Sequence, residues 1–116
     1  EGASKNIHVN TIAPMAASRM TESILPAEAL AVLKPEAVSP LVAWLCSEQC
    51  ETTGGIFEAG GGFFGRVRLE RSLGWHQAVG RDVKTESIRD QWQAISDFTE
   101  SIHPSNMLEA MQSMIA

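Results

Sequence analysis

The sequence predicts an α/β fold, and three observations in its first sixty residues lead to this prediction. A β-branched run over residues 7–13 ends at Pro14, and its apolar residues are not confined to one alternating set, as in a parallel-sheet strand buried on both faces. Helix-forming sequence follows over residues 26–50, and a second short strand, "IFEA", begins at Ile56. Two strands separated by helices belong to a sheet with crossover connections rather than to a simple hairpin.

Between the two strands the sequence predicts a loop and then helices. The segment "MAASRMTESILP" is small and polar, which favours a flexible loop or short helix of the kind that often covers a site. "PAEALAVL" is a good helix former, and "KPEAVSPLVAWLCSEQC" is a stronger one, with Pro35 near its first turn and Pro40 placed to bend it rather than break it. Cys46 and Cys50 stand at i, i+4 in this helix, which predicts plain thiols in a reducing compartment rather than a disulfide or zinc site.

The second half of the chain predicts a strand-like extension followed by two helices. After three glycines, "RVRLER" alternates with the period of a strand. Residues 73–84 show no strong period and predict a connecting stretch. A helix is expected from Thr85, its N-cap, with Ile88, Trp92 and Ile95 on one face, and a last helix is expected from Ser105 to the end.

Length and composition limit the classes of protein. With 116 residues the chain allows one small domain or a piece of one. The net charge of -5, with 14 acidic and 9 basic residues, argues against nucleic-acid binding. The sequence has neither a long apolar run nor a secretory leader, so we expect a soluble intracellular protein. Two or three strands are too few for an independently stable sheet, so we expect further sheet on the N-terminal side.

One stretch of the sequence matches the letter pattern of a cofactor-binding motif. Gly60, Gly62 and Gly65 stand at the spacing G-x-G-x-x-G of the dinucleotide-binding fingerprint. That fingerprint needs a helix to start within it, so that its N-terminal N–H groups meet the pyrophosphate. Because the period-two pattern of "GRVRLER" indicates a strand instead, we interpret the glycines as a turn.

Other candidate groups are scattered. The three histidines, His8, His76 and His103, have no spacing typical of metal ligands, so no metal site is predicted. The hydroxyls of Ser18 and Thr21, in the loop after the first strand, are candidates for hydrogen bonds to a ligand. The arginines of "RVRLER" predict a solvated face, with a role toward an anionic ligand as the alternative.

Four motifs in order resemble a known family. "NIHVNTIAP", "SRMT", "KPEAVSPLVAWLCSEQC" and "TGGIFEAGGG" are similar, in sequence order and spacing, to the C-terminal half of the short-chain dehydrogenase/reductase fold. The resemblance covers residues 1–75, and the helical tail more weakly. It implies a fold class: the last two strands of a Rossmann-like, doubly wound parallel sheet over residues 1–75, with a helical extension over residues 76–116. The strand "GGIFEAGGG" would be the edge strand, used in the family for dimer contacts.

The resemblance also implies an activity. Within the family the chain is similar to enzymes of fatty-acid β-oxidation that oxidise (3R)-hydroxyacyl-CoA with NAD, and that branch suggests a peroxisomal location. The turn at Pro14 would lie beside the nicotinamide, and the backbone of Ile12 and the hydroxyl of Ser18 would hold the carboxamide. The loop from Met15 to Leu33 would cover the substrate. The cofactor-binding residues implied are Asn10, Ile12, Pro14, Ser18 and Thr21.

The family's catalytic Tyr and Lys and its glycine-rich cofactor turn would lie upstream of Glu1. The sequence contains no tyrosine, so we predict no catalytic residue here and expect the chain to be inactive alone. Its partner would be the missing N-terminal half or a second copy of the chain. Two alternatives stay open: a non-catalytic interaction or dimerisation module, and a self-contained nucleotide-binding enzyme that uses Gly60, Gly62 and Gly65.

Overall fold

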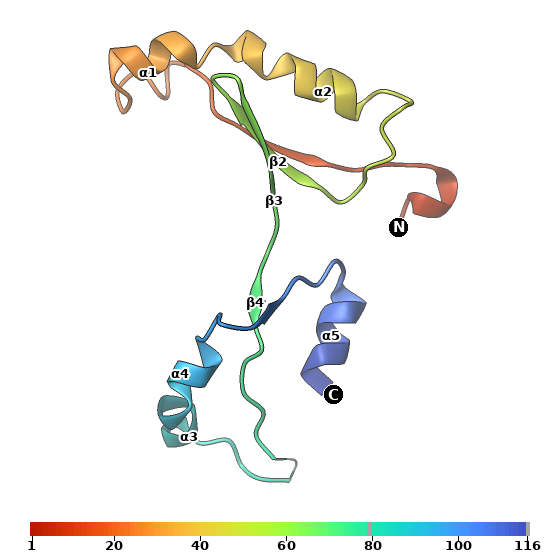
Figure 1. The fold of residues 1–116 in the computed structure, drawn as a ribbon, viewed down its shortest axis with the longest axis vertical. Helices are drawn as coiled ribbons and strands as arrows, with labels where there is room; N and C mark the ends of the chain where they lie inside the picture. The colour runs from red at the N-terminus through yellow and green to blue at the C-terminus, as the bar shows by residue number, and fades with distance from the viewer. Residues whose placement is uncertain (79, 116) are drawn as a thin grey trace. The chain divides into compact units, whose positions relative to one another are not determined.

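The computed structural model describes residues 1–78 and 80–115 and divides into two units (Figure 1). Unit 1 is Glu1–Arg68 and unit 2 is Leu69–Ala116. The sequence places the boundary after Trp75 instead, inside the connecting stretch. Val79, also in that stretch, and Ala116, the end of the last predicted helix, lie outside the described residues.

Unit 1 is built on a three-stranded mixed sheet in the order β1-β2-β3. β1, Thr11–Pro14, runs parallel to β2, Ile56–Gly60, with Ile12 opposite Phe57. β3, Phe63–Val67, returns antiparallel to β2. The α/β class with a parallel crossover is therefore confirmed, although β1 begins later than the predicted strand.

The position of β2 in the sheet corrects one expectation. The segment "GGIFEAGGG" was expected to form the edge strand, but β2 pairs with β1 on one side and β3 on the other. It is the central strand of the three. The alternating residues after the glycines supply the additional strand, so β1 and β3 are the edges.

The helices of unit 1 are shorter than the sequence pattern predicts. A 3₁₀ turn at Ala3–Lys5 precedes β1, and α1 spans Ala27–Val32. The next predicted helix is divided into a 3₁₀ turn, Pro35–Ala37, and α2, Ser39–Leu45, with Pro40 in the first turn of α2. Proline has no N–H to donate and fits only at a helix start, so the two prolines give two starts. Consequently Cys50 lies beyond the helix, buried at 3% exposure, while Cys46 caps its end.

The glycines form a hairpin turn, as the sequence indicates. Gly60 ends β2, Gly61 and Gly62 have φ values of 58° and 86°, and Gly65 lies inside β3. Two consecutive positive φ values are typical of the tight turns that join antiparallel strands. Since no helix starts here, the residues lack the geometry of a pyrophosphate-binding fingerprint.

The two faces of the sheet differ in burial. Residues paired across the strands share a face. On one face Ala59 is 2% exposed and Ile12 and Phe57 are half-buried, whereas Glu58 and Ala13 on the other face are exposed. Figure 1 shows α1 and α2 running along one side of this sheet. The second face has no covering element among the residues described for unit 1.

Unit 2 is built around a short antiparallel pair of strands. β4, Arg71–Ser72, pairs with β5, Ser101–Ile102, and no sequence pattern predicts this two-residue ladder. The helix expected from Thr85 is interrupted at Gln91, giving α3, Thr85–Asp90, and α4, Trp92–Ile95. Lys84 rather than Thr85 is the N-cap residue of α3. The last helix, α5, spans Met107–Ile115.

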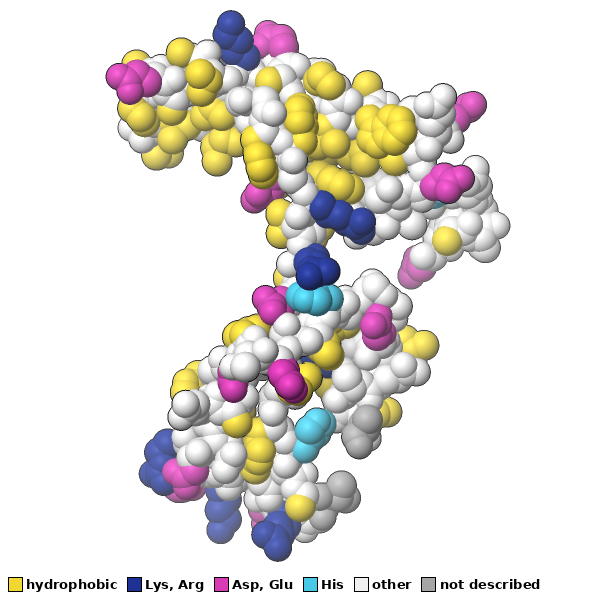
Figure 2. Space-filling model, viewed as in Figure 1, with side chains coloured by type: hydrophobic (Ala, Val, Ile, Leu, Met, Phe, Trp, Pro, Cys, Tyr) yellow, Lys and Arg dark blue, Asp and Glu magenta, His cyan; other side chains and the backbone are white. Residues whose placement is uncertain are grey.

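Neither unit buries a large side chain completely within the described part of the chain. Cys50 and Ala59 are its buried hydrophobic residues. Figure 2 shows yellow hydrophobic side chains at the surface of both units, and Trp44 and Trp92 are 52% and 61% exposed. The described residues contain no helix that is long and apolar enough to cross a membrane.

Candidate functional site

The carboxyl end of β1 forms the candidate site in unit 1. In open sheets with parallel strands, ligands bind beyond the carboxyl ends of the strands. A cavity of about 380 Å³ lies at this end, where β1, β2 and the start of β3 meet the residue after α1. It is lined by Ala13, Pro14, Met15, Leu33, Glu58, Ala59, Gly60 and Phe63. Pro14 is therefore at the cavity, whereas Ser18 and Thr21 are not among its lining residues.

The backbone of Ile12 faces away from β2. The N–H groups of Thr11 and Met15 donate to the carbonyls of Gly55 and Ala59, each at 2.8 Å. Because peptide groups alternate in direction along a strand, those of Ile12 must point to the opposite, free edge of the sheet. Ile12 thus presents one N–H donor and one C=O acceptor at the edge of β1, beside the cavity.

Ser18 and Thr21 form a compact turn after β1. The Thr21 hydroxyl accepts a hydrogen bond from the Ser18 N–H at 2.8 Å and lies 3.2 Å from the Ala16 carbonyl, to which it can donate. The Ser18 hydroxyl accepts from the Met20 N–H at 3.3 Å and is exposed. The Ser18 hydroxyl also lies 3.5 Å from the Thr21 hydroxyl, and either can be the donor. A ligand would compete with this long contact for the Ser18 proton, while the Thr21 hydroxyl is committed to the turn.

The side chain of Asn10 forms two hydrogen bonds to the backbone of the loop before β2. Its Nδ2 donates to the Thr52 carbonyl at 2.8 Å, and its Oδ1 accepts from the Gly55 N–H at 3.0 Å. The amide therefore joins the segment before β1 to the loop before β2. This geometry makes Asn10 a residue that positions β1.

The loop between β1 and α1 is tied down at its base. The Ala17 N–H donates to the Leu33 carbonyl at 2.6 Å, closing residues 17–33 into a loop. Met20 and Ile24, near its middle, are 83% and 77% exposed. This small, polar loop therefore combines an anchored base with two exposed apolar side chains, and its role as a cover for the substrate stays a prediction.

Sequence reasoning did not assign five of the eight lining residues to this site: Ala13, Glu58, Ala59, Gly60 and Phe63. A Cβ on Gly60 would lie 2.6 Å from the Met15 carbonyl oxygen, so only glycine lets the ends of β1 and β2 approach this closely. Glu58 is paired with Ala13 and brings a carboxylate to the cavity. The positions of Glu58 and Gly60 at the site depend on the register between β1 and β2, which cannot be read from the sequence pattern.

Two of the remaining charged or metal-ligating candidates, Arg66 and His8, have local partners. Arg66 lies over the Phe57 ring, 5.7 Å from its centroid. The Nδ1 atom of His8 is 3.2 Å from the Cys50 carbonyl oxygen. Across residues 1–78 and 80–115, no three His, Cys, Asp or Glu side chains gather in a way that could hold a metal ion.

Comparison with known proteins shows which larger proteins the chain resembles. No protein-family profile matches the chain. Peroxisomal multifunctional enzyme type 2 of Mus musculus is 48% identical over 114 residues, which cover 95% of this chain. The solved structure of the full-length Drosophila melanogaster enzyme superimposes on 98% of the chain with a TM-score of 0.83 and 29% identity. The chain is homologous to one segment of peroxisomal multifunctional enzyme type 2.

The match to the multifunctional enzymes is partial on their side. The chain spans 15% of the mouse enzyme and 21% of the Drosophila chain. A short-chain type dehydrogenase/reductase of Mycobacterium tuberculosis is 40% identical over 99 residues, or 85% of this chain and 34% of that protein. The resemblance seen in the sequence motifs is therefore confirmed, and the α/β fold matches a fragment of the multifunctional enzyme.

Proposed function

We propose that the chain is the C-terminal part of a dehydrogenase domain that oxidises (3R)-hydroxyacyl-CoA with NAD in peroxisomal fatty-acid β-oxidation. The observation that carries this proposal is the 48% identity to peroxisomal multifunctional enzyme type 2 across 95% of the chain. The location follows from the names of the relatives, and the reaction from the short-chain dehydrogenase motifs.

The residues at the end of β1 fit the nicotinamide end of such a cofactor. A carboxamide needs both a hydrogen-bond acceptor and a donor, and Ile12 offers its outward N–H and C=O while Ser18 offers an exposed hydroxyl. NAD would supply the hydride acceptor. In this proposal Ile12 and Ser18 orient the carboxamide, Pro14 shapes the turn beside it, Thr21 fixes Ser18, and Asn10 holds β1 in register.

The general acid/base must come from another segment. The sequence contains no tyrosine, and the glycines of the hairpin do not open a helix that would bind phosphates. We therefore propose that a polypeptide with the preceding part of the domain supplies both, and that it pairs with the free edge of β1 and covers the exposed face of the sheet.

Reconstitution tests this proposal. The chain is mixed with the region that precedes the matching segment in the mouse enzyme, and NADH formation from a (3R)-hydroxyacyl-CoA is followed. Activity should appear only in the mixture. In the active mixture, Ser18→Ala should raise the KM for NAD roughly two- to tenfold, because one hydrogen bond is lost.

The matched control is Ser23→Ala, which removes an exposed hydroxyl from the same loop. It should leave the KM for NAD unchanged. A well-folded mixture without activity would contradict the proposed reaction, and equal effects of the two serine variants would contradict the role of Ser18.

A second candidate function is a non-catalytic interaction module, and the exposed sheet face and free β1 edge favour it. The same mixture separates the two: a stable complex with no NADH formation favours the module. Binding of NAD by the chain alone would support neither the dehydrogenase part nor the interaction module. In both proposals the chain lacks the segment that binds the phosphates.

A further inference from the structure

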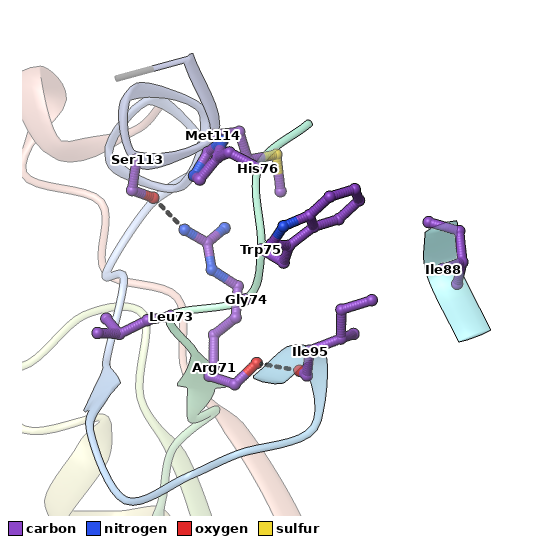
Figure 3. A pocket seen from close by; sticks show the side chains of 10 residues that line it. Arg71, Leu73, Gly74, Trp75, His76, Ile88, Ile95, Ser113 and Met114 are labelled. Carbon is purple, nitrogen blue, oxygen red and sulfur yellow. Dashed lines mark hydrogen bonds between the residues drawn. The ribbon is translucent and has the colours of Figure 1, made fainter. Parts of the chain in front are cut away.

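Unit 2 contains a cavity of about 410 Å³ that the proposed function does not use (Figure 3). It is bounded by β4 and the residues after it, by α3 and α4, and by the last turns of α5. The residues that matter here are Arg71, Trp75, His76, Ile88, Ile95 and Met114.

Arg71 brings a positive charge into this cavity. It is half-buried, its Nη1 donates to the Ala110 carbonyl at 3.1 Å, and its Nη2 donates to the Ser113 hydroxyl. Figure 3 shows its side chain extending from β4 to Ser113 on α5. These two bonds use two of the five N–H groups of the guanidinium and leave three.

The charge of Arg71 has no counter-ion in the described part of the chain. Over residues 1–78 and 80–115 the ion pair found is Arg89 with Asp90, both exposed. A partly desolvated charge is unfavourable unless an opposite charge offsets it. The carbonyl end of α5 offsets only part of it, so an anion in the cavity would be stabilised by the remaining N–H groups.

The other walls are apolar. Trp75, Ile88 and Ile95 are half-buried, and Met114 lies on the α5 side. The Ser72 hydroxyl, also at the wall, is directed to the Ile95 carbonyl at 2.6 Å and is therefore occupied. His76 is exposed at the cavity wall.

We propose that this cavity binds an organic anion, in which a carboxylate or phosphate lies on Arg71 and an apolar body lies among Trp75, Ile88 and Ile95. A bidentate acid group matches the planar guanidinium better than a neutral headgroup does. The proposal concerns unit 2 alone and does not depend on the dehydrogenase assignment.

The test compares three probes that share one alkyl chain: octanoate, octyl phosphate and octan-1-ol. Each is titrated into the full chain by isothermal titration calorimetry. Both anions should bind at least about tenfold more tightly than the alcohol, because a charge-assisted hydrogen bond is stronger than a neutral one. A preference of octanoate over octyl phosphate, or the reverse, identifies the headgroup.

Variants separate the charge of Arg71 from its contact with α5. Arg71→Gln should lower octanoate affinity about tenfold and leave octan-1-ol affinity unchanged. Ser113→Ala removes one bond of Arg71 but keeps its charge, so octanoate should still bind. Arg81→Gln, which removes an exposed cation of the same unit, is the matched control. Circular dichroism checks that each variant is folded.

Two results would overturn the proposal. The first is equal affinity of the unchanged chain for octanoate and octan-1-ol, or no binding of either anion, which requires no variant and is therefore independent of folding defects. The second is unchanged octanoate affinity in a folded Arg71→Gln chain.

Discussion

At the scale of single residues, Asn10 couples two segments that are distant in the sequence. Its amide donates to the Thr52 carbonyl and accepts from the N–H of Gly55, a buried residue. A buried N–H that loses its hydrogen-bond partner destabilises the folded state. Removal of the Asn10 Oδ1 atom would therefore lower stability mainly by leaving the Gly55 N–H unpaired. Thr53 adds a second link, because its hydroxyl accepts from the Val9 N–H at 3.0 Å.

Asn10→Ala should therefore lower the free energy of unfolding of unit 1 by about 1–3 kcal/mol. Gln49→Ala, an exposed amide that makes no hydrogen bond among the described side chains, should change it by less than about 0.5 kcal/mol. Urea denaturation followed by the fluorescence of Trp44, in a background with the other tryptophans replaced by Phe, measures both. Equal stability of the two variants would show that the Asn10 bonds contribute nothing.

At the scale of elements, α5 begins with a closed set of hydrogen bonds. The Glu109 N–H donates to Asn106 Oδ1 at 2.9 Å, and Glu109 Oε2 accepts from the Ser105 N–H at 2.8 Å and the Ser105 hydroxyl at 2.6 Å. This is a variant of the capping box, in which a side chain three residues into the helix bonds back to its start. The hydrogen bond from the Ser105 hydroxyl, followed by that from its N–H, lowers the pKa of Glu109 below 4.5.

A lowered pKa in the folded state gives α5 a pH dependence. The contribution of Glu109 to stability is present above pH 4.5 and is lost as the pH falls through the lower, folded-state pKa. At neutral pH the helicity of Glu109→Gln should therefore be lower than that of the unchanged chain. This difference should become smaller in acid. Glu86→Gln in α3 is the matched control. Circular dichroism at 222 nm measures helicity, and a difference that does not change with pH would contradict the prediction.

The elements also show what the sequence could predict. Local signals were sufficient for the first strand, the helical regions and the glycine turn, because periodicity and positive-φ glycines act within a few residues. They did not predict the pairing of β4 with β5 or the central place of β2, which depend on contacts between distant residues. For the same reason they did not bring Glu58 and Gly60 to the cavity beside Pro14, and the cofactor-binding role of Pro14 stays a prediction.

At the scale of the whole molecule, unit 1 exposes the surfaces that a parallel sheet normally buries. Glu58 and Ala13 lie on an exposed face, and Ile56 is 37% exposed although it lies in the central strand. Parallel strands are almost always covered on both faces. This exposure is consistent with the proposal that further polypeptide covers the sheet, and the chain spans 15% of the mouse relative.

The free edge of β1 gives the last prediction. The outward N–H and C=O of Ile12 can pair with an added strand, so the chain without a partner should self-associate through this edge. Ile12→Pro removes the outward N–H and spares the bonds of Thr11 and Met15 to β2, so the association constant should fall about tenfold. Ile12→Ala shortens the same side chain but keeps the N–H, and it should still associate. Sedimentation equilibrium measures the constants, and circular dichroism checks that the sheet is retained. If the unchanged chain stays monomeric, or if the two variants associate equally, the edge of β1 is not the site of pairing.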